Sequence, residues 1–145
     1  MGGKSRQRAC TRLGKRILVV EDEEAIREMV SSVLASADYH CRAVSSGKEA
    51  LSLLQSGKRF DLMLCDLRNK PHGVILLALT KEKFPEMPVV IMTAPCCACT
   101  ANFAANEMGA SAVLLKPFDC TELLVTLYRA LEGSRLPVFH NIGVA

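Results

Sequence analysis

Three carboxylates, one hydroxyl and one ammonium stand directly after four short apolar runs of the kind that form buried strands. In chain order, the polar residues that close these runs are Glu21, Asp22, Asp66, Thr93 and Lys116. If the four strands are parallel, their carboxyl ends share one edge of a sheet, where ligands bind in open α/β folds. The sequence therefore predicts a polar site at this edge.

The residue types of this site favour phosphoryl chemistry. Three carboxylates in one crevice repel each other unless a cation neutralises them. Mg²⁺ fits best, because it binds one or two carboxylates and keeps positions for water or phosphate oxygens. With one Mg²⁺ and Lys116 the formal charges sum to about zero, so a phosphoryl group can approach. Asp66 is the expected nucleophile, which would form an acyl phosphate, and Thr93 would hydrogen-bond a phosphoryl oxygen.

Strand and helix patterns alternate along the chain and predict the elements that position these residues. The expected strands cover residues 17–20, 39–44, 62–66, 89–93 and 112–115. The expected helices cover about residues 25–34, 46–54, 74–83, 97–108 and 123–131. Several strands are continuously apolar, which is typical of a parallel sheet covered on both faces. We expect an α/β, doubly wound, five-stranded parallel sheet with the order 2-1-3-4-5, because that order brings Glu21, Asp22 and Asp66 to one crevice.

Over about residues 15–132 the chain resembles the receiver domain of two-component response regulators, and in particular the stand-alone, chemotaxis-regulator-like members. Five motifs carry the resemblance in order and at similar spacing: Val19 to Glu23, the strand that ends at Asp66, Met92 to Ala94, Gly109-Ala110, and Lys116-Pro117-Phe118. The resemblance implies a flavodoxin-like receiver fold. It also implies that a histidine kinase or a phosphotransfer protein phosphorylates Asp66.

The resemblance assigns further roles. The metal ligands it implies for Mg²⁺ are Glu21, Asp22, Asp66 and the backbone carbonyl of Arg68, and the phosphoryl-binding residues are Thr93 and Lys116. The Lys116–Pro117 peptide bond is often cis in the family. A receiver of this kind is not a conventional enzyme: it catalyses its own phosphorylation and a slow self-dephosphorylation. It would signal through contact with an unknown downstream protein, as a monomer or a phosphorylation-dependent dimer.

Among the departures of the chain from the family pattern, two concern the loop after Asp66 and position 113. Asn69 and Lys70 stand where members usually have Met-Pro, Pro71 comes one position late, and Gly73 comes one position early. Val113 stands where members usually have a switch Tyr or Phe. Because Val is short and stiff, we expect residues 95–108 to move on phosphorylation instead.

These departures leave other functions open. The main alternative is a degenerate receiver-fold interaction module that has lost regulated phosphorylation. An aspartyl phosphatase would use the same nucleophile, but such enzymes typically have a second acid two residues later, where this chain has Arg68.

The ends of the chain differ from the central part in charge. Six basic residues and no acid lie in residues 1–16, whereas the whole chain of 145 residues has a net charge of +3. We expect residues 1–14 to form a disordered basic arm, residues 15–132 the receiver domain, and residues 133–145 a short tail. No apolar run is long enough for a membrane helix or a signal peptide. The expectation is a cytoplasmic protein with no membrane contact and no DNA-binding domain in the chain.

Seven cysteines are an odd and high number for this length. Without a secretion signal they are best interpreted as reduced thiols, several of them small core residues. Cys96, Cys97 and Cys99 raise the possibility of a soft-metal or redox site. Their pattern offers no second ligand pair at a recognised spacing, so the sequence favours the simpler interpretation.

Overall fold

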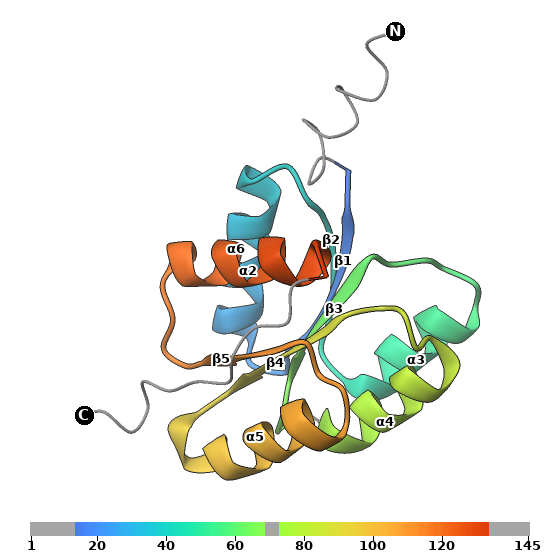
Figure 1. The fold of residues 1–145 in the computed structure, drawn as a ribbon. Helices are drawn as coiled ribbons and strands as arrows, with labels where there is room; N and C mark the ends of the chain where they lie inside the picture. Colours follow the sequence, from blue (N-terminus) through green and yellow to red (C-terminus); the bar gives the residue numbers. More distant parts are fainter. Residues whose placement is uncertain (1–13, 69–72, 134–145) are drawn as a thin grey trace, which may run out of the picture.

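The structure is a computed structural model that describes residues 14–68 and 73–133 (Figure 1). Its strands are β1 (Arg16–Val20), β2 (His40–Val44), β3 (Leu62–Asp66), β4 (Val89–Thr93) and β5 (Ala112–Leu115). Its helices are α2 (Glu24–Ser36), α3 (Gly47–Gln55), α4 (Gly73–Lys83), α5 (Ala98–Glu107) and α6 (Cys120–Leu131), with a short 3₁₀ helix, η1 (Pro95–Cys97). The predicted basic arm and the tail after residue 133 lie outside the described residues.

The five strands form one parallel sheet in the order β2-β1-β3-β4-β5, which confirms the predicted topology. Helices α2 and α6 cover one face, and α3, α4 and α5 cover the other (Figure 1). Successive strand residues point to opposite faces. Leu18 and Val20 therefore join the core beneath α3, α4 and α5, while Ile17 and Val19 join the core beneath α2 and α6.

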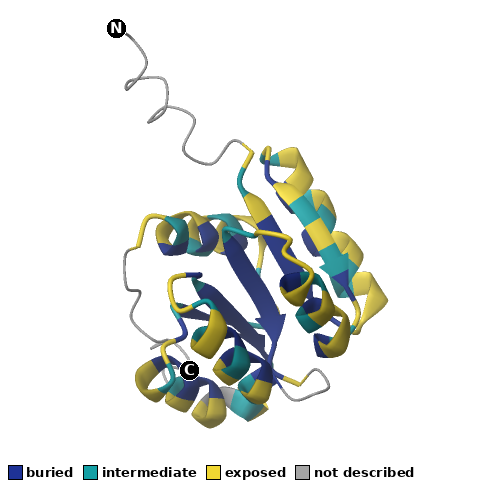
Figure 2. Ribbon diagram, turned by 90° about the vertical axis from the view of Figure 1, so that its right-hand side faces the viewer, coloured by how far each residue is buried: buried dark blue, intermediate teal, exposed yellow. Residues whose placement is uncertain are grey.

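Burial on both faces explains why the strands read as continuous apolar runs. All five residues of β3 and of β4 are buried, and these central strands are dark blue throughout in Figure 2. Strand β2 lies at an edge of the sheet and alternates in exposure. The central strands therefore hold the ends of β3 and β4 at fixed positions.

Local sequence signals set three of the helix ends. The Ser46 side chain accepts a hydrogen bond from the Glu49 amide at the start of α3, and Asp119 forms a capping box with Glu122 at the start of α6. Gly109 follows the end of α5 with a φ of +85°, a conformation that glycine adopts without steric cost.

The starts of α2, α3, α4 and α5 each differ from the predicted ones by a single residue. Helix α4 begins at Gly73 rather than Val74, and α5 begins at Ala98 because residues 95–97 form the tighter η1 turn. The longest described helix, α2, has 13 residues, and none of the described helices combines the length and apolar character needed to cross a bilayer.

Candidate functional site

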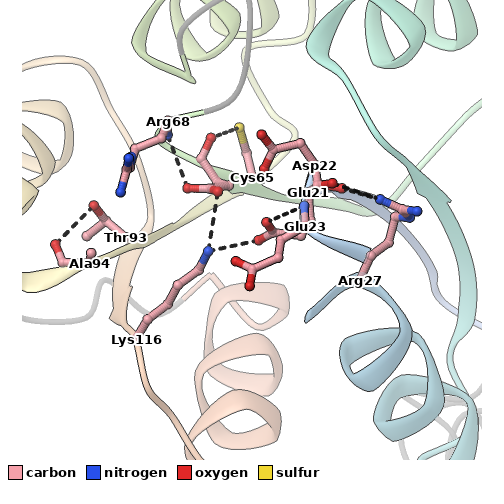
Figure 3. Close-up of polar contacts among 10 residues, drawn as sticks. Glu21, Asp22, Glu23, Arg27, Cys65, Arg68, Thr93, Ala94 and Lys116 are labelled. Carbon is pink, nitrogen blue, oxygen red and sulfur yellow. Dashed lines mark hydrogen bonds and ion pairs between the residues drawn. The ribbon is translucent and has the colours of Figure 1, made fainter. Parts of the chain in front are cut away.

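Strand register brings the predicted site residues to one edge of the sheet. Val20 pairs with Cys65, so Glu21 and Asp66 each lie one position further along neighbouring strands. Thr93 pairs with Leu115 at the far side of the same edge, and Lys116 follows directly. Figure 3 shows Glu21, Asp22 and Lys116 close together at this edge, with Thr93 to one side.

The three acids form one compact group. Glu21 and Asp66 are buried, with 0% and 4% exposure, whereas Asp22 is exposed. One carboxylate oxygen from each of the three lies within 4.8 Å of the other two. In the described part of the chain, this is the one group of acid, histidine or cysteine residues close enough to hold a metal ion. All its donors are oxygens, which suit a hard divalent cation.

Lys116 bridges the two buried acids. Its Nζ atom lies 3.0 Å from Glu21 Oε1 and 3.3 Å from Asp66 Oδ2 (Figure 3). Burial lowers the pKa of Lys116, but the hydrogen bond to Glu21 and the charge of Asp66 outweigh it and raise the pKa overall. Burial raises the pKa of Glu21, and this outweighs the opposing effect of its hydrogen bond with Lys116. One ammonium is therefore not enough to compensate fully for burying this carboxylate.

Backbone groups orient both buried carboxylates. The Glu23 amide donates to Glu21 Oε2 at 3.1 Å, and the Arg68 amide donates to Asp66 Oδ1 at 3.1 Å. Arg27 Nη1 donates to the Glu21 carbonyl at 2.9 Å, which holds the turn before α2. These contacts leave Asp66 with one oxygen on Lys116 and the other on a backbone amide.

Gly73 makes a close backbone contact beside Asp66. A Cβ atom at this position would lie 2.6 Å from Leu67 Cα and 2.8 Å from the Asp66 carbonyl oxygen, so only glycine fits. The Gly73 amide also donates to the Leu67 carbonyl at 2.9 Å. Although Gly73 comes one position early for the family, it packs directly against the strand end. The other altered loop residues, 69–72, lie outside the described part of the chain.

Thr93 and Val113 occupy the opposite half of the site. Thr93 is buried, and its hydroxyl donates to the Ala94 carbonyl at 3.3 Å. Val113 is 7% exposed and belongs to the core beneath α3, α4 and α5. The Lys116–Pro117 peptide bond is cis, as the resemblance implies.

Sequence reasoning did not foresee the η1 turn, which places Cys97 near the end of β4. The pKa of the Cys97 thiol is raised, first by its hydrogen bond with Cys96 and next by burial, whereas a hydrogen bond with Thr93 and the charge of Arg68 act in the opposite direction. The η1 turn brings Cys97 back toward the end of β4, where its amide donates to the Ala94 carbonyl. Only the turn geometry reveals this position of Cys97, because the local sequence spacing is not distinctive.

The arrangement is suited to attack by a carboxylate on an electrophile that carries negative charge. Asp66 contacts the Lys116 ammonium and is one of three carboxylates that can together hold a cation. The Lys116 ammonium and a bound cation would together stabilise the oxygens of a transferred phosphoryl group.

Comparison with known families identifies the class of protein. Residues 17–128 match the model of the response regulator receiver domain. The chain therefore belongs to this family, as its motifs predict, and its fold and acidic site are those of a two-component signalling receiver.

Among curated proteins the chain is similar to longer regulators. It is 36% identical over 117 residues to the DNA-binding transcriptional regulator NtrC of Salmonella typhimurium. This match covers 80% of this chain and 24% of that protein. It is 36% identical over 121 residues to the transcriptional regulatory protein ZraR of Klebsiella oxytoca, covering 83% and 27%. The chain thus spans about a quarter of the length of these relatives.

Solved structures show the same fold. NtrX from Brucella abortus, crystallised in complex with ADP, has a TM-score of 0.78 and 30% identity, covering 83% of this chain and 28% of that chain. The chemotaxis response regulator CheY4 of Vibrio cholerae has a TM-score of 0.73 and 28% identity, covering 81% and 98%. The second match spans nearly the whole of a small receiver protein.

Proposed function

We propose that the chain accepts a phosphoryl group on Asp66 and signals through a change at its surface. The observation that carries this proposal is the position of Asp66, which is buried at the end of β3 beside Lys116 and the paired acids Glu21 and Asp22. Burying these charges costs free energy. A degenerate interaction module would have no need of them.

The step is a displacement at phosphorus. A carboxylate oxygen of Asp66 forms a bond to phosphorus while the bond from phosphorus to the donor breaks, and the donor takes the electron pair. The Lys116 ammonium donates to one phosphoryl oxygen. The Thr93 hydroxyl would turn from the Ala94 carbonyl to donate to another. Slow attack by water on the acyl phosphate would return the free carboxylate.

The three carboxylates fit Mg²⁺, because they are hard oxygen donors grouped within one coordination shell. Glu21, Asp22, Asp66 and the Arg68 carbonyl would hold the ion. When bound, Mg²⁺ neutralises the acids and the developing charge on the phosphoryl oxygens.

The expected phosphoryl donor is a histidine kinase or a phosphotransfer protein, and the unit that accepts the group spans residues 15–132. The family match over residues 17–128 supports both inferences. The downstream partner would be a protein that distinguishes the two states of the receiver surface.

Intact-mass measurement after incubation with acetyl phosphate and Mg²⁺ tests the proposal. We expect the wild type to gain one phosphoryl group, Asp66→Asn to gain none, and Lys116→Ala to gain it much more slowly. Asp38→Asn is the matched control, because Asp38 is an exposed acid in a turn whose positive φ asparagine also tolerates. Equal labelling of wild type and Asp66→Asn would reject Asp66 as the acceptor, and a folded wild type without labelling would favour the degenerate module.

A further inference from the structure

An open hollow lies at the end of the sheet opposite to the phosphoryl-acceptor site. Its volume of about 650 Å³ lies within the roughly 300–1,000 Å³ range of pockets that hold small ligands. Asp61 and Pro88, the residues directly before β3 and β4, line it. The other lining residues come from the last turn of α3 and from the segments that lead into these two strands. The hollow is therefore separate from the acidic site at the carboxyl ends of the strands.

Apolar side chains make up much of the lining. Leu54 and Met87 are buried, whereas Phe60 and Phe84 are partly buried and pack against the core beneath α3, α4 and α5. Both rings line the hollow and keep part of their surface open to water. Apolar surface that stays open in a concave place is typical of a binding site. An aromatic group of a ligand could therefore replace water against these two rings.

Hydrogen bonds hold the walls of the hollow in place. The Asp61 amide donates to the Arg16 carbonyl at 2.7 Å, which fixes the chain as it enters β3. Lys81 Nζ donates to the carbonyls of Pro85 and Met87, at 3.3 and 2.8 Å, and so ties α4 to the loop before β4. The hollow is thus largely preformed, as sites for small ligands usually are.

Cations stand around the aromatic lining. Lys58 and Arg59 line the hollow and are exposed, and in the part of the chain that the structure describes they take part in no ion pair. The Arg16 guanidinium lies over the Phe60 ring, 5.5 Å from its centroid. The charges of these side chains are therefore available to an anion that enters the hollow.

Two acids also line the hollow, but they are fewer than the cations. Asp61 Oδ2 already accepts a hydrogen bond from the Arg16 amide at 2.8 Å. Glu86 lies where the hollow adjoins a smaller one of about 200 Å³, which Lys81 also lines. Four cations therefore surround the hollow against two acids, and the net charge favours an anion.

We propose that this hollow binds an amphipathic carboxylate, a small molecule in which an aromatic group stands next to a carboxylate. The aromatic group would pack against Phe60 and Phe84, since ring pairs gain more than their buried area alone provides. The carboxylate would lie beside Arg59, whose planar guanidinium can donate two parallel hydrogen bonds to it. A single negative charge suits the hollow better than a phosphate dianion, which the two acids would repel more strongly. This site does not depend on the proposed phosphoryl transfer.

Titration of the full chain with α-naphthylacetate, followed by the fluorescence anisotropy of the naphthyl group, tests the site. The chain has no tryptophan, so the naphthyl emission is observed without tryptophan background. We expect one bound molecule per chain. The neutral α-naphthylacetamide keeps the ring but lacks the charge, and we expect it to bind roughly tenfold more weakly. No binding of α-naphthylacetate, or equal binding of the two probes, would overturn the proposal.

Substitutions locate the bound probe. Lys58→Ala/Arg59→Ala should weaken the binding of α-naphthylacetate roughly tenfold and leave that of α-naphthylacetamide unchanged. Arg42→Ala/Lys48→Ala is the matched control, because it removes the same charge from exposed residues that do not line the hollow. It should bind both probes as the wild type does. Phe84→Leu should weaken both probes by a similar factor, because it removes the aromatic surface. Equal affinity of the two double variants for α-naphthylacetate would overturn the site.

Discussion

The two halves of the site are built differently. At the ends of β1 and β3, Glu21 and Asp66 are held by Lys116 and by backbone amides at distances of 3.0 to 3.3 Å. At the end of β4, the Thr93 hydroxyl donates to the next carbonyl, and the short η1 turn follows. The first half is a charged network that fixes the acceptor. The second has no ion pair among the described residues and can rearrange more easily.

The helices beside each half differ in the same way. Helix α4 follows β3 and anchors itself with Leu76 and Leu77, both fully buried. Helix α5 follows β4 and contributes mainly alanines to the core, among them Ala101 and Ala104. An alanine buries much less apolar area than a leucine, so α5 gains less free energy from its packing. We infer that the acceptor half is rigid and that α5 is the part that responds.

The largest expected effect concerns the rigid half. Gly73→Ala should lower the free energy of unfolding by about 3 kcal/mol, because its Cβ would overlap the backbone of Leu67. Gly57→Ala is the control, since its φ of +92° is strained but its surroundings are open, and about 1 kcal/mol is expected. Denaturant unfolding measures both. Equal losses would show that the contact beside Asp66 is not tight.

A second prediction concerns the responsive half. Beryllofluoride, a mimic of the phosphoryl group, should together with Mg²⁺ change amide hydrogen exchange in residues 95–108 about tenfold, which corresponds to about 1.4 kcal/mol, because α5 is held by little apolar area. Helix α2 is the internal reference and should change much less. Unchanged exchange in residues 95–108 despite bound beryllofluoride would assign the response elsewhere and favour a module that does not switch.

A third prediction tests the charges of the rigid half. The raised pKa of Glu21 means that the folded state holds its proton at higher pH than the unfolded chain does. This contribution to stability is therefore present at low pH and is lost as pH rises from about the ordinary value of 4.5 through the raised pKa. Glu21→Gln removes the ionisable group, so stability is no longer lost as the pH rises. The substitution should stabilise the metal-free protein at pH 7 by about 1 kcal/mol.

The same substitution should reduce stabilisation by Mg²⁺, since one ligand is gone. Thermal unfolding at pH 4 and pH 7, with and without Mg²⁺, separates the two effects. A variant less stable than the wild type at pH 7 without metal would show that the ion pair with Lys116 outweighs the burial of Glu21.

The smallest expected effect lies in α5. The Asn102 Oδ1 atom is buried and lacks a hydrogen-bond partner among the described residues. Asn102→Ala should stabilise the protein by roughly 0.5 kcal/mol more than Asn106→Ala, because it also removes the buried acceptor. Asn106 is an exposed residue of the same helix, so its substitution brings only the gain in helix propensity. Identical shifts in chemical denaturation would indicate that the Asn102 acceptor carries no cost.

Most of the fold follows from local patterns in the sequence. Continuous apolar runs predicted the strands, and Ser46 and Gly109 predicted the ends of α3 and α5 to within a residue or two. The η1 turn was not predicted, because a 3₁₀ turn and the first turn of an α-helix place the same kinds of residues at nearly the same spacing. This one missed turn brings the Cys97 amide to the Ala94 carbonyl.

The sequence by itself determined which residues close the strands, and therefore that three acids, Thr93 and Lys116 share one edge of the sheet. Strand identity depends on apolar runs that can be read locally, and parallel order follows from the alternation of strands and helices. Only the tertiary structure decided that Lys116 bridges Glu21 and Asp66, that Gly73 is confined by Leu67, and that two thiols lie 3.7 Å apart. These contacts depend on register, side-chain rotamers and packing between elements distant in sequence, which no local pattern encodes.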